Sequence, residues 1–92
     1  MTTEEILNHL AAVPYDLDVR RSPDTNRCRQ FVVGWDDAAV RGRTYTEDTL
    51  RSLTWRNLGF RFGQRFGSRS KEEIKQACAV LFSHYEKTVR MF

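Results

Sequence analysis

Hydrogen-bonding and cationic side chains recur between Thr54 and Gly67, where the chain reads T-W-R-N-L-G-F-R-F-G-Q-R-F-G. From Arg51 to Arg69 there are five arginines and no acidic residue. Arginine presents paired donors that suit phosphate and guanine, and asparagine and glutamine pair with the edge of adenine. These residue types therefore indicate contact with nucleic acid. The candidate nucleic-acid-binding residues are Arg51, Arg56, Asn57, Arg61, Gln64, Arg65 and Arg69.

Catalytic and metal-binding patterns are missing from the sequence. Its two histidines and two cysteines are too scattered to indicate a metal site. The carboxylate pairs Asp36-Asp37 and Glu72-Glu73 are adjacent, so in a helix their side chains point about 100° apart and would not share a proton unaided. The glycines match neither a dinucleotide fingerprint nor a phosphate-binding loop. We therefore expect no enzyme activity, no cofactor and no metal.

The arginine-rich stretch must itself be folded, and its spacing predicts a helix. Its apolar face recurs at helical intervals and consists of Trp55, Leu58, Phe62 and Phe66. Gly59, Gly63 and Gly67 recur at every fourth position, a pattern that lets two helix backbones approach closely. Since two interior glycines cost a soluble helix about 2 kcal/mol, we expect them to pack closely against the last helix or the segment around Trp35.

A short helix is expected directly before this stretch, over residues 46–53. Thr46 is its predicted N-cap, and Leu50 and Leu53 would face inward. Tyr45 is placed to pack against Leu50 in the manner of a hydrophobic staple.

Thr54 is the predicted cap of the next helix, so the two helices resemble a helix–turn–helix pair whose second helix could enter a major groove. Phe60 on that helix cannot be both an exposed reader and a core residue. If Phe60 is buried, the readable surface narrows to Arg61, Gln64 and Arg65.

Residues 25–41 fit two structures. The run F-V-V-G-W has the β-propensity of a strand, and a hairpin would use Asp36-Asp37 as its turn. A helix is favoured, with Gly42 in the left-handed position just after its end. The buried face of that helix would contain Cys28, Phe31, Trp35 and Ala38. Gly34 would let another element approach this helix closely.

Capping boxes mark the start of two further helices. Thr2 pairs with Glu5 ahead of a helix over residues 2–13, and Ser70 pairs with Glu73 ahead of one over residues 70–90. The apolar face of the first consists of Ile6, Leu7, Leu10 and Val13, and that of the last of Ile74, Ala77, Cys78, Leu81, Tyr85 and Val89. We expect the last helix to be the central packing surface, residues 14–25 to be a connector and His9 to lie at the surface.

The totals predict a single small domain, residues 1–92, with an all-α fold of about five helices. The net charge is +3, and residues 27–69 alone carry nine arginines against four acids. The N-terminus is acidic and unlike a signal peptide, and no apolar run approaches the ~20 residues of a membrane span, so a cytoplasmic location is expected. Cys28 and Cys78 are expected to be buried free thiols.

A longer segment carries a resemblance. The run Y-T-E-D-T-L-R-S-L-T-W-R-N-L-G-F-R-F-G-Q-R-F-G, with G-W-D-D-A before it, resembles a motif of short uncharacterised bacterial helical domains, L-T-W-x-N-L-G-x-R-x-G. Such domains stand alone, occur on mobile gene cassettes or precede HNH-type restriction endonucleases. The resemblance covers roughly residues 31–67 and implies a DNA-associated accessory domain without catalysis of its own.

Two main hypotheses follow. The first is a DNA-binding or DNA-associated module that uses the arginine-rich helix edge and contacts duplex DNA. The alternative is a protein-interaction module, a homodimer or a small regulatory partner, which the aromatic content and the glycine-lined helix edge favour. A small-molecule pocket between the segments of Trp35 and Trp55 is a third possibility. We instead expect both tryptophan side chains to belong to the core.

Overall fold

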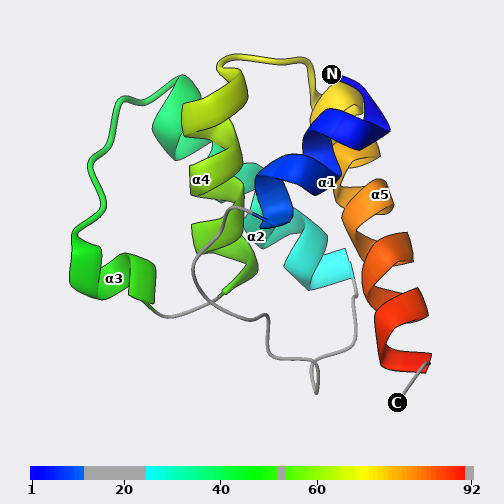
Figure 1. Cartoon of the computed structure of the whole chain (residues 1–92). Coiled ribbons are helices and arrows are strands. Elements are labelled where there is room, and N and C mark those ends of the chain that lie inside the picture. The colour runs from blue at the N-terminus through cyan, green and yellow to red at the C-terminus, as the bar shows by residue number, and fades with distance from the viewer. Residues whose placement is uncertain (12–24, 52–53, 91–92) are drawn as a thin grey trace.

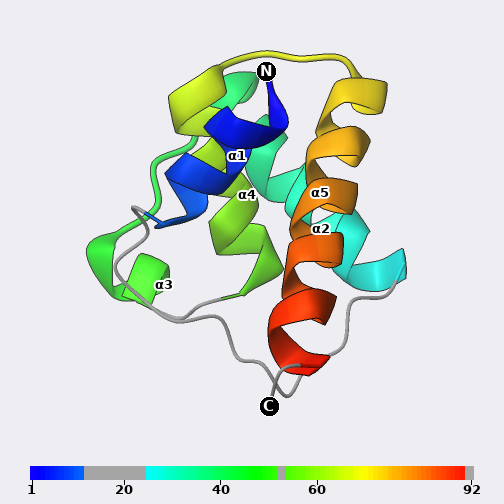
Figure 2. The ribbon, with the colours of Figure 1, turned by 45° about the vertical axis from the view of Figure 1, so that its right-hand side comes forward.

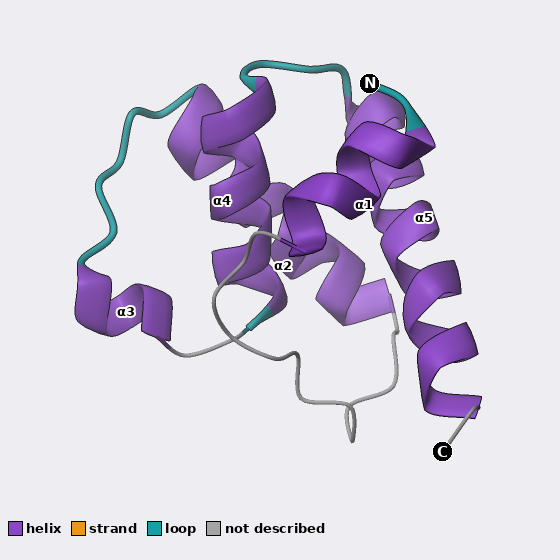
Figure 3. Ribbon diagram, in the orientation of Figure 1, coloured by secondary structure: helices purple, strands orange, loops and turns teal. Residues whose placement is uncertain are grey.

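Five helices make up the regular structure of the described residues in the computed structural model of the chain (Figure 1). They are α1 (Thr3–Ala11), α2 (Thr25–Ala39), α3 (Glu47–Arg51), α4 (Trp55–Phe66) and α5 (Lys71–Arg90). The structure describes the backbone of residues 1–11, 25–51 and 54–90, and the side chains of these except residues 25, 51 and 85–90. Every regular element in this part of the chain is a helix (Figure 3), which confirms the all-α prediction.

These bounds decide between the helix and the hairpin that fit residues 25–41. Residues 25–39 form a helix, so the hairpin that would have turned at Asp36-Asp37 is wrong. The predicted connector over residues 14–25 lies outside the described residues except for Thr25, which begins α2. Val13 and Leu53 also lie outside them.

Side-chain caps explain why the helices begin where they do. The backbone N–H of Glu5 donates to Thr2 Oγ1, and that of Thr2 donates back to the Glu5 carboxylate, both at 3.1 Å. The N–H of Glu73 donates to Ser70 Oγ at 3.2 Å. Such caps satisfy N–H groups that have no partner within the helix. The predicted caps Thr46 and Thr54 are also confirmed.

A left-handed glycine follows the end of α2, as the sequence predicts. Gly42 has a φ of 63°. Just before it, the carbonyl oxygen of Asp36 accepts from the N–H groups of Val40 and Arg41, both at 2.9 Å. The N–H of Arg43 then bonds to the carbonyl oxygen of Asp37 at 2.8 Å. The chain therefore leaves α2 along a path that is fixed by backbone hydrogen bonds.

The centre of the bundle is the pair α2 and α4, whose backbones touch. A Cβ atom at any of three glycines would lie 1.8 to 2.5 Å from a carbonyl oxygen of the facing helix. The contacts join Gly34 to Arg56, Gly59 to Phe31 and Gly63 to Trp35. Residue numbers rise together from Phe31–Gly59 to Trp35–Gly63, whereas Gly34 meets Arg56 at the start of α4. The two helices therefore run in the same general direction but cross at an angle (Figure 1).

This pairing corrects the prediction that the last helix is the central packing surface. Of the two partners proposed for the glycines, the segment around Trp35 is the right one. The physical reason is that α5 contains no glycine, so side chains hold it farther from its neighbours, whereas α2 and α4 meet backbone to backbone. The α5 helix instead packs along one side of α2 and α1 (Figure 2).

Aromatic rings fill the space around this pair. Phe31 lies with its ring centroid 5.8 Å from Trp35 and 6.3 Å from Trp55, and all three side chains are buried. The Trp35 indole donates to the carbonyl oxygen of Gly67 at 2.8 Å. The two tryptophans are thus core residues separated by a third ring. The other helices add Ile6, Ile74, Ala77, Cys78 and Leu81 to the core.

The contact of α1 with α4 corrects a further expectation. His9 does not stand at the surface among polar neighbours: it is half-buried, with Nε2 3.2 Å from the carbonyl oxygen of Arg61. Its ring meets that of Phe62 edge-on, with the centroids 4.7 Å apart. The side chain therefore helps to hold α1 against α4.

Cys28 and Cys78 are both free thiols, as predicted, although Cys28 is only half-buried. Burial and the neighbouring Cys28 raise the pKa of the Cys78 thiol. No described helix has the length and apolar content needed to cross a membrane.

Candidate nucleic-acid interface

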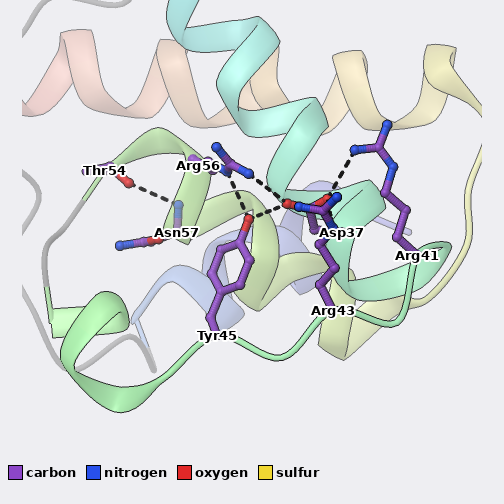
Figure 4. A network of polar contacts seen from close by, with 7 residues as sticks. All are labelled: Asp37, Arg41, Arg43, Tyr45, Thr54, Arg56 and Asn57. Carbon is purple, nitrogen blue, oxygen red and sulfur yellow. Dashed lines mark hydrogen bonds and ion pairs between the residues drawn. The ribbon is translucent and has the colours of Figure 1, made fainter.

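A buried carboxylate surrounded by arginines lies where the end of α2 meets the start of α4 (Figure 4). The side chain of Asp37 has no exposed surface. One of its oxygens, Oδ2, accepts from the Tyr45 hydroxyl and, at 3.1 Å, from Arg56 Nη2. The other, Oδ1, lies 3.3 Å from Arg41 Nη1 and 3.8 Å from Arg43 Nε. We call Asp37, Arg41, Arg43, Tyr45 and Arg56 the Asp37 cluster.

Tyr45 anchors the connection between α2 and α3 to this cluster. Its ring stacks on Phe60, with centroids 4.0 Å apart and planes 9° from parallel. Its hydroxyl also accepts a hydrogen bond from Arg56 Nε at 2.9 Å. Tyr45 therefore contacts α2 and α4, and its predicted staple with Leu50 stays a prediction. A hydrophobic staple joins residues that are near in sequence, whereas Phe60 and Asp37 are brought to Tyr45 by the tertiary fold.

The charges of the Asp37 cluster do not cancel. Three guanidinium groups share one carboxylate, and their side chains are 56% (Arg41), 59% (Arg43) and 43% (Arg56) exposed, whereas the carboxylate is covered. Burial by itself would raise the pKa of Asp37, but the hydrogen bonds from Tyr45 and Arg56 and the charge of Arg43 outweigh it and lower that pKa. Asp37 is consequently ionised at neutral pH, and the surface above it carries surplus positive charge.

Two residues of the predicted reading edge lie inside the protein. Asn57 is 5% exposed, and its side-chain amide donates to the carbonyl oxygen of Thr49 at 2.6 Å. Phe60 is 2% exposed beneath the ring of Tyr45. Because Phe60 is buried, the predicted readable surface on the outer edge of α4 narrows to Arg61, Gln64 and Arg65.

The other predicted residues are spread over α4 and the segments next to it. Arg56 belongs to the Asp37 cluster, at the first turn of α4. Gln64 and Arg65 are exposed in its last turn, and Arg61 is half-buried. Beyond the helix, Arg69 lies 3.7 Å from the Glu73 carboxylate. Arg51 ends α3, and its side chain is outside the described part. The described residues of the predicted set are therefore spread along a helix about 18 Å long and past its end.

Sequence reasoning missed most of the Asp37 cluster. From the sequence alone, Asp37 is half of an adjacent carboxylate pair or a turn residue, and neither Arg41 nor Arg43 is among the candidate binding residues. One local signal was available, because Asp37 and Arg41 have the i, i+4 spacing of a helical ion pair. The approach of Tyr45 and Arg56 depends on the contact between α2 and α4 and has no local signal.

A second surface feature lies between α1 and α5. A mainly apolar hollow of about 340 Å³ is lined by Leu7, Ala79, Val80 and neighbouring residues of both helices. A hollow of about 240 Å³, lined in part by Ile6 and Ala77, adjoins it. Neither contains any residue of the predicted nucleic-acid edge.

Comparisons with protein-family models, curated proteins and solved structures find no match. In the described ranges, no group of three or more histidine, cysteine, aspartate or glutamate side chains is arranged to hold a metal ion.

Proposed function

We propose that this protein is a non-catalytic DNA-binding module, an accessory domain that associates with duplex DNA in the cytoplasm. The observation that carries the proposal is the charge balance of the Asp37 cluster. Three half-exposed arginines surround a carboxylate that solvent does not reach. A polyanion facing this surface therefore meets guanidinium groups and not the acid between them.

The exposed part of α4 favours contact with phosphates over deep reading of a major groove. Seven of the twelve residues of α4 are buried, including Asn57. A helix that reads base edges needs a continuous face open to the groove. Gln64 and Arg65 at its last turn and Arg69 beyond it would supplement the Asp37 cluster with further contacts. Contacts of this kind position a protein on DNA without specifying a sequence.

A salt-dependent titration with a duplex DNA of mixed sequence tests the proposal. We expect binding at ~50 mM salt, with log K falling linearly against log salt because each neutralised phosphate releases counterions. Absence of binding at ~50 mM salt, or an affinity that does not change with salt, would contradict a DNA-binding function.

The alternative function, a protein-interaction module, is favoured by the apolar hollow between α1 and α5. Val40, which is 65% exposed, adds an apolar residue to the surface elsewhere. Apolar surface of this kind can mark a protein interface. Sedimentation velocity at micromolar concentration tests the homodimer form of this idea: a concentration-dependent dimer would support it, and a monomer throughout would exclude it.

A further inference from the structure

We propose that the Asp37 cluster is a preformed site for a phosphate group of the DNA backbone, in which Asp37 and Tyr45 are positioning residues for Arg41, Arg43 and Arg56. This inference rests on the proposed function and goes beyond it. It identifies one site, the chemistry of its ligand and the groups that prepare it, and it moves the main contact away from the outer edge of α4.

Arg56 is held in place before any ligand arrives, and Arg41 and Arg43 are drawn to the same acid. Arg56 donates through Nε to Tyr45 and through Nη2 to Asp37, so two of its nitrogens are anchored (Figure 4). Arg41 and Arg43 each approach the other carboxylate oxygen of Asp37. Long side chains lose much rotational freedom when they bind a ligand, and prior anchoring lowers that cost.

The backbone that carries two of these arginines is also ordered. The N–H groups of Arg41 and Arg43 bond to the carbonyl oxygens of Asp36 and Asp37, at 2.9 and 2.8 Å. Between them Gly42 takes the left-handed conformation, with a φ of 63°. The connection is therefore shaped by hydrogen bonds at its base while the arginine side chains face solvent.

The three arginines offer more N–H donors than the Asp37 carboxylate can accept. One carboxylate has about four lone-pair sites, and each guanidinium has about five N–H donors. The Tyr45 hydroxyl already takes part of the carboxylate. A purely structural ion pair would be satisfied by one arginine, whereas here three converge on a single acid. The N–H groups that remain can donate to the oxygens of a tetrahedral oxyanion, and guanidinium groups match phosphate geometry well.

The negative group of the cluster lies beneath the positive ones. Asp37 is completely covered, and the groups that cover it include the arginines themselves. A ligand at the surface therefore meets three positive groups, whose charge is only partly neutralised by one buried negative group. This polarity suits a phosphate diester and disfavours a cation.

The test compares variants of the full chain by titration with the same mixed-sequence duplex. Arg41→Ala/Arg43→Ala removes two positive charges at the cluster, and Arg29→Ala/Lys75→Ala removes two exposed charges elsewhere. We expect the cluster variant to bind about tenfold more weakly at ~100 mM salt and to lower the magnitude of the salt slope by about 1 or more. The control variant should lose no more than about threefold.

Two further variants separate positioning from charge. Tyr45→Phe keeps every charge and the ring that stacks on Phe60 but removes the hydroxyl. Asp37→Asn makes the protein one unit more positive. Simple attraction would leave binding unchanged in the first and strengthen it in the second. Loss of preorganisation should instead weaken both by about threefold or more.

The outcomes are distinguishable. If the wild type binds no duplex, the proposed function fails, and the site fails with it. If the wild type binds but Arg41→Ala/Arg43→Ala equals its control, only the phosphate site is overturned. Circular dichroism and thermal melting check that each variant is folded. Should Asp37→Asn or Tyr45→Phe be unfolded, the comparison of the two surface double variants, which leave the buried groups in place, still decides.

Discussion

The α-carbon of Gly59 faces the carbonyl oxygen of Phe31 so closely that a methyl group there would lie 2.0 Å from that oxygen. No side-chain movement can relieve this contact, because the obstructing atoms belong to the backbone of α2. The cost of glycine inside α4 is thus offset by an approach of two helices that only glycine allows.

We expect Gly59→Ala to destabilise the fold by about 1–3 kcal/mol, since overpacking at this contact outweighs the gain in helix propensity. Urea unfolding measures the change. Gln64→Ala is the matched control, on the exposed side of the same helix, and should lie within about 0.5 kcal/mol of the wild type. A stabilised Gly59→Ala variant would show that α2 and α4 are farther apart than described.

These glycines and the Asp37 cluster differ in how well the sequence predicts them. Helix starts, caps and the close contact at Gly59 and Gly63 are predictable because each depends on local spacing. Glycine spacing does not choose between the two candidate partner segments, because it indicates that a backbone comes close without indicating which one. The Asp37 cluster joins three segments, and no pattern along the chain records that meeting.

Asn57 gives a test of whether a predicted reader is structural. Its amide is buried and bonded to the carbonyl oxygen of Thr49. We expect Asn57→Ala to lower the free energy of unfolding by about 1–3 kcal/mol, because a buried carbonyl group loses its partner and a space is left. Thermal or urea unfolding measures this loss. If Asn57→Ala left stability unchanged and reduced DNA affinity, Asn57 would be a surface reader after all.

Acid should weaken the fold through Asp37. The pKa of its carboxyl group is lower in the folded protein than in the unfolded chain, where aspartate titrates near about 3.9. The unfolded state therefore binds the proton first. The stabilising contribution of Asp37 is complete above that value and is lost as the pH falls below it toward the folded pKa.

Urea unfolding of the wild type and of Asp37→Asn, from about pH 6 to about pH 3, checks this expectation. The wild type should be the more stable of the two near pH 6. Its advantage should shrink as the acid is protonated. An advantage that stayed constant across this range would mean that the pKa of Asp37 is the same in the folded and the unfolded protein.

A second pH dependence is expected at His9. Burial lowers the pKa of this imidazole, against the opposing effect of its hydrogen bond to the Arg61 carbonyl, and the charges of Arg65 and Arg61 lower it further. The unfolded chain therefore binds a proton more readily than the folded one, and stability should decrease as the pH falls through about 6.5.

His9→Gln keeps a side-chain donor but cannot titrate, so it isolates this effect. Melting temperatures between about pH 8 and pH 5 should fall more steeply for the wild type than for His9→Gln. Parallel curves for the two proteins would show that His9 is equally basic in the folded and unfolded chains. The sequence placed His9 at the surface because its neighbours along α1 are polar, and its contact with Phe62 is visible only in the tertiary fold.

The most direct test of the central claim is to map which backbone amides of the isotope-labelled protein shift in NMR spectra when a short duplex DNA is added. We expect the largest shifts at residues 41–45 and at Arg56, with smaller ones near Gln64 and Arg65. Shifts confined to the residues that line the hollow between α1 and α5, or no shifts at all at low salt, would contradict DNA contact through the Asp37 cluster.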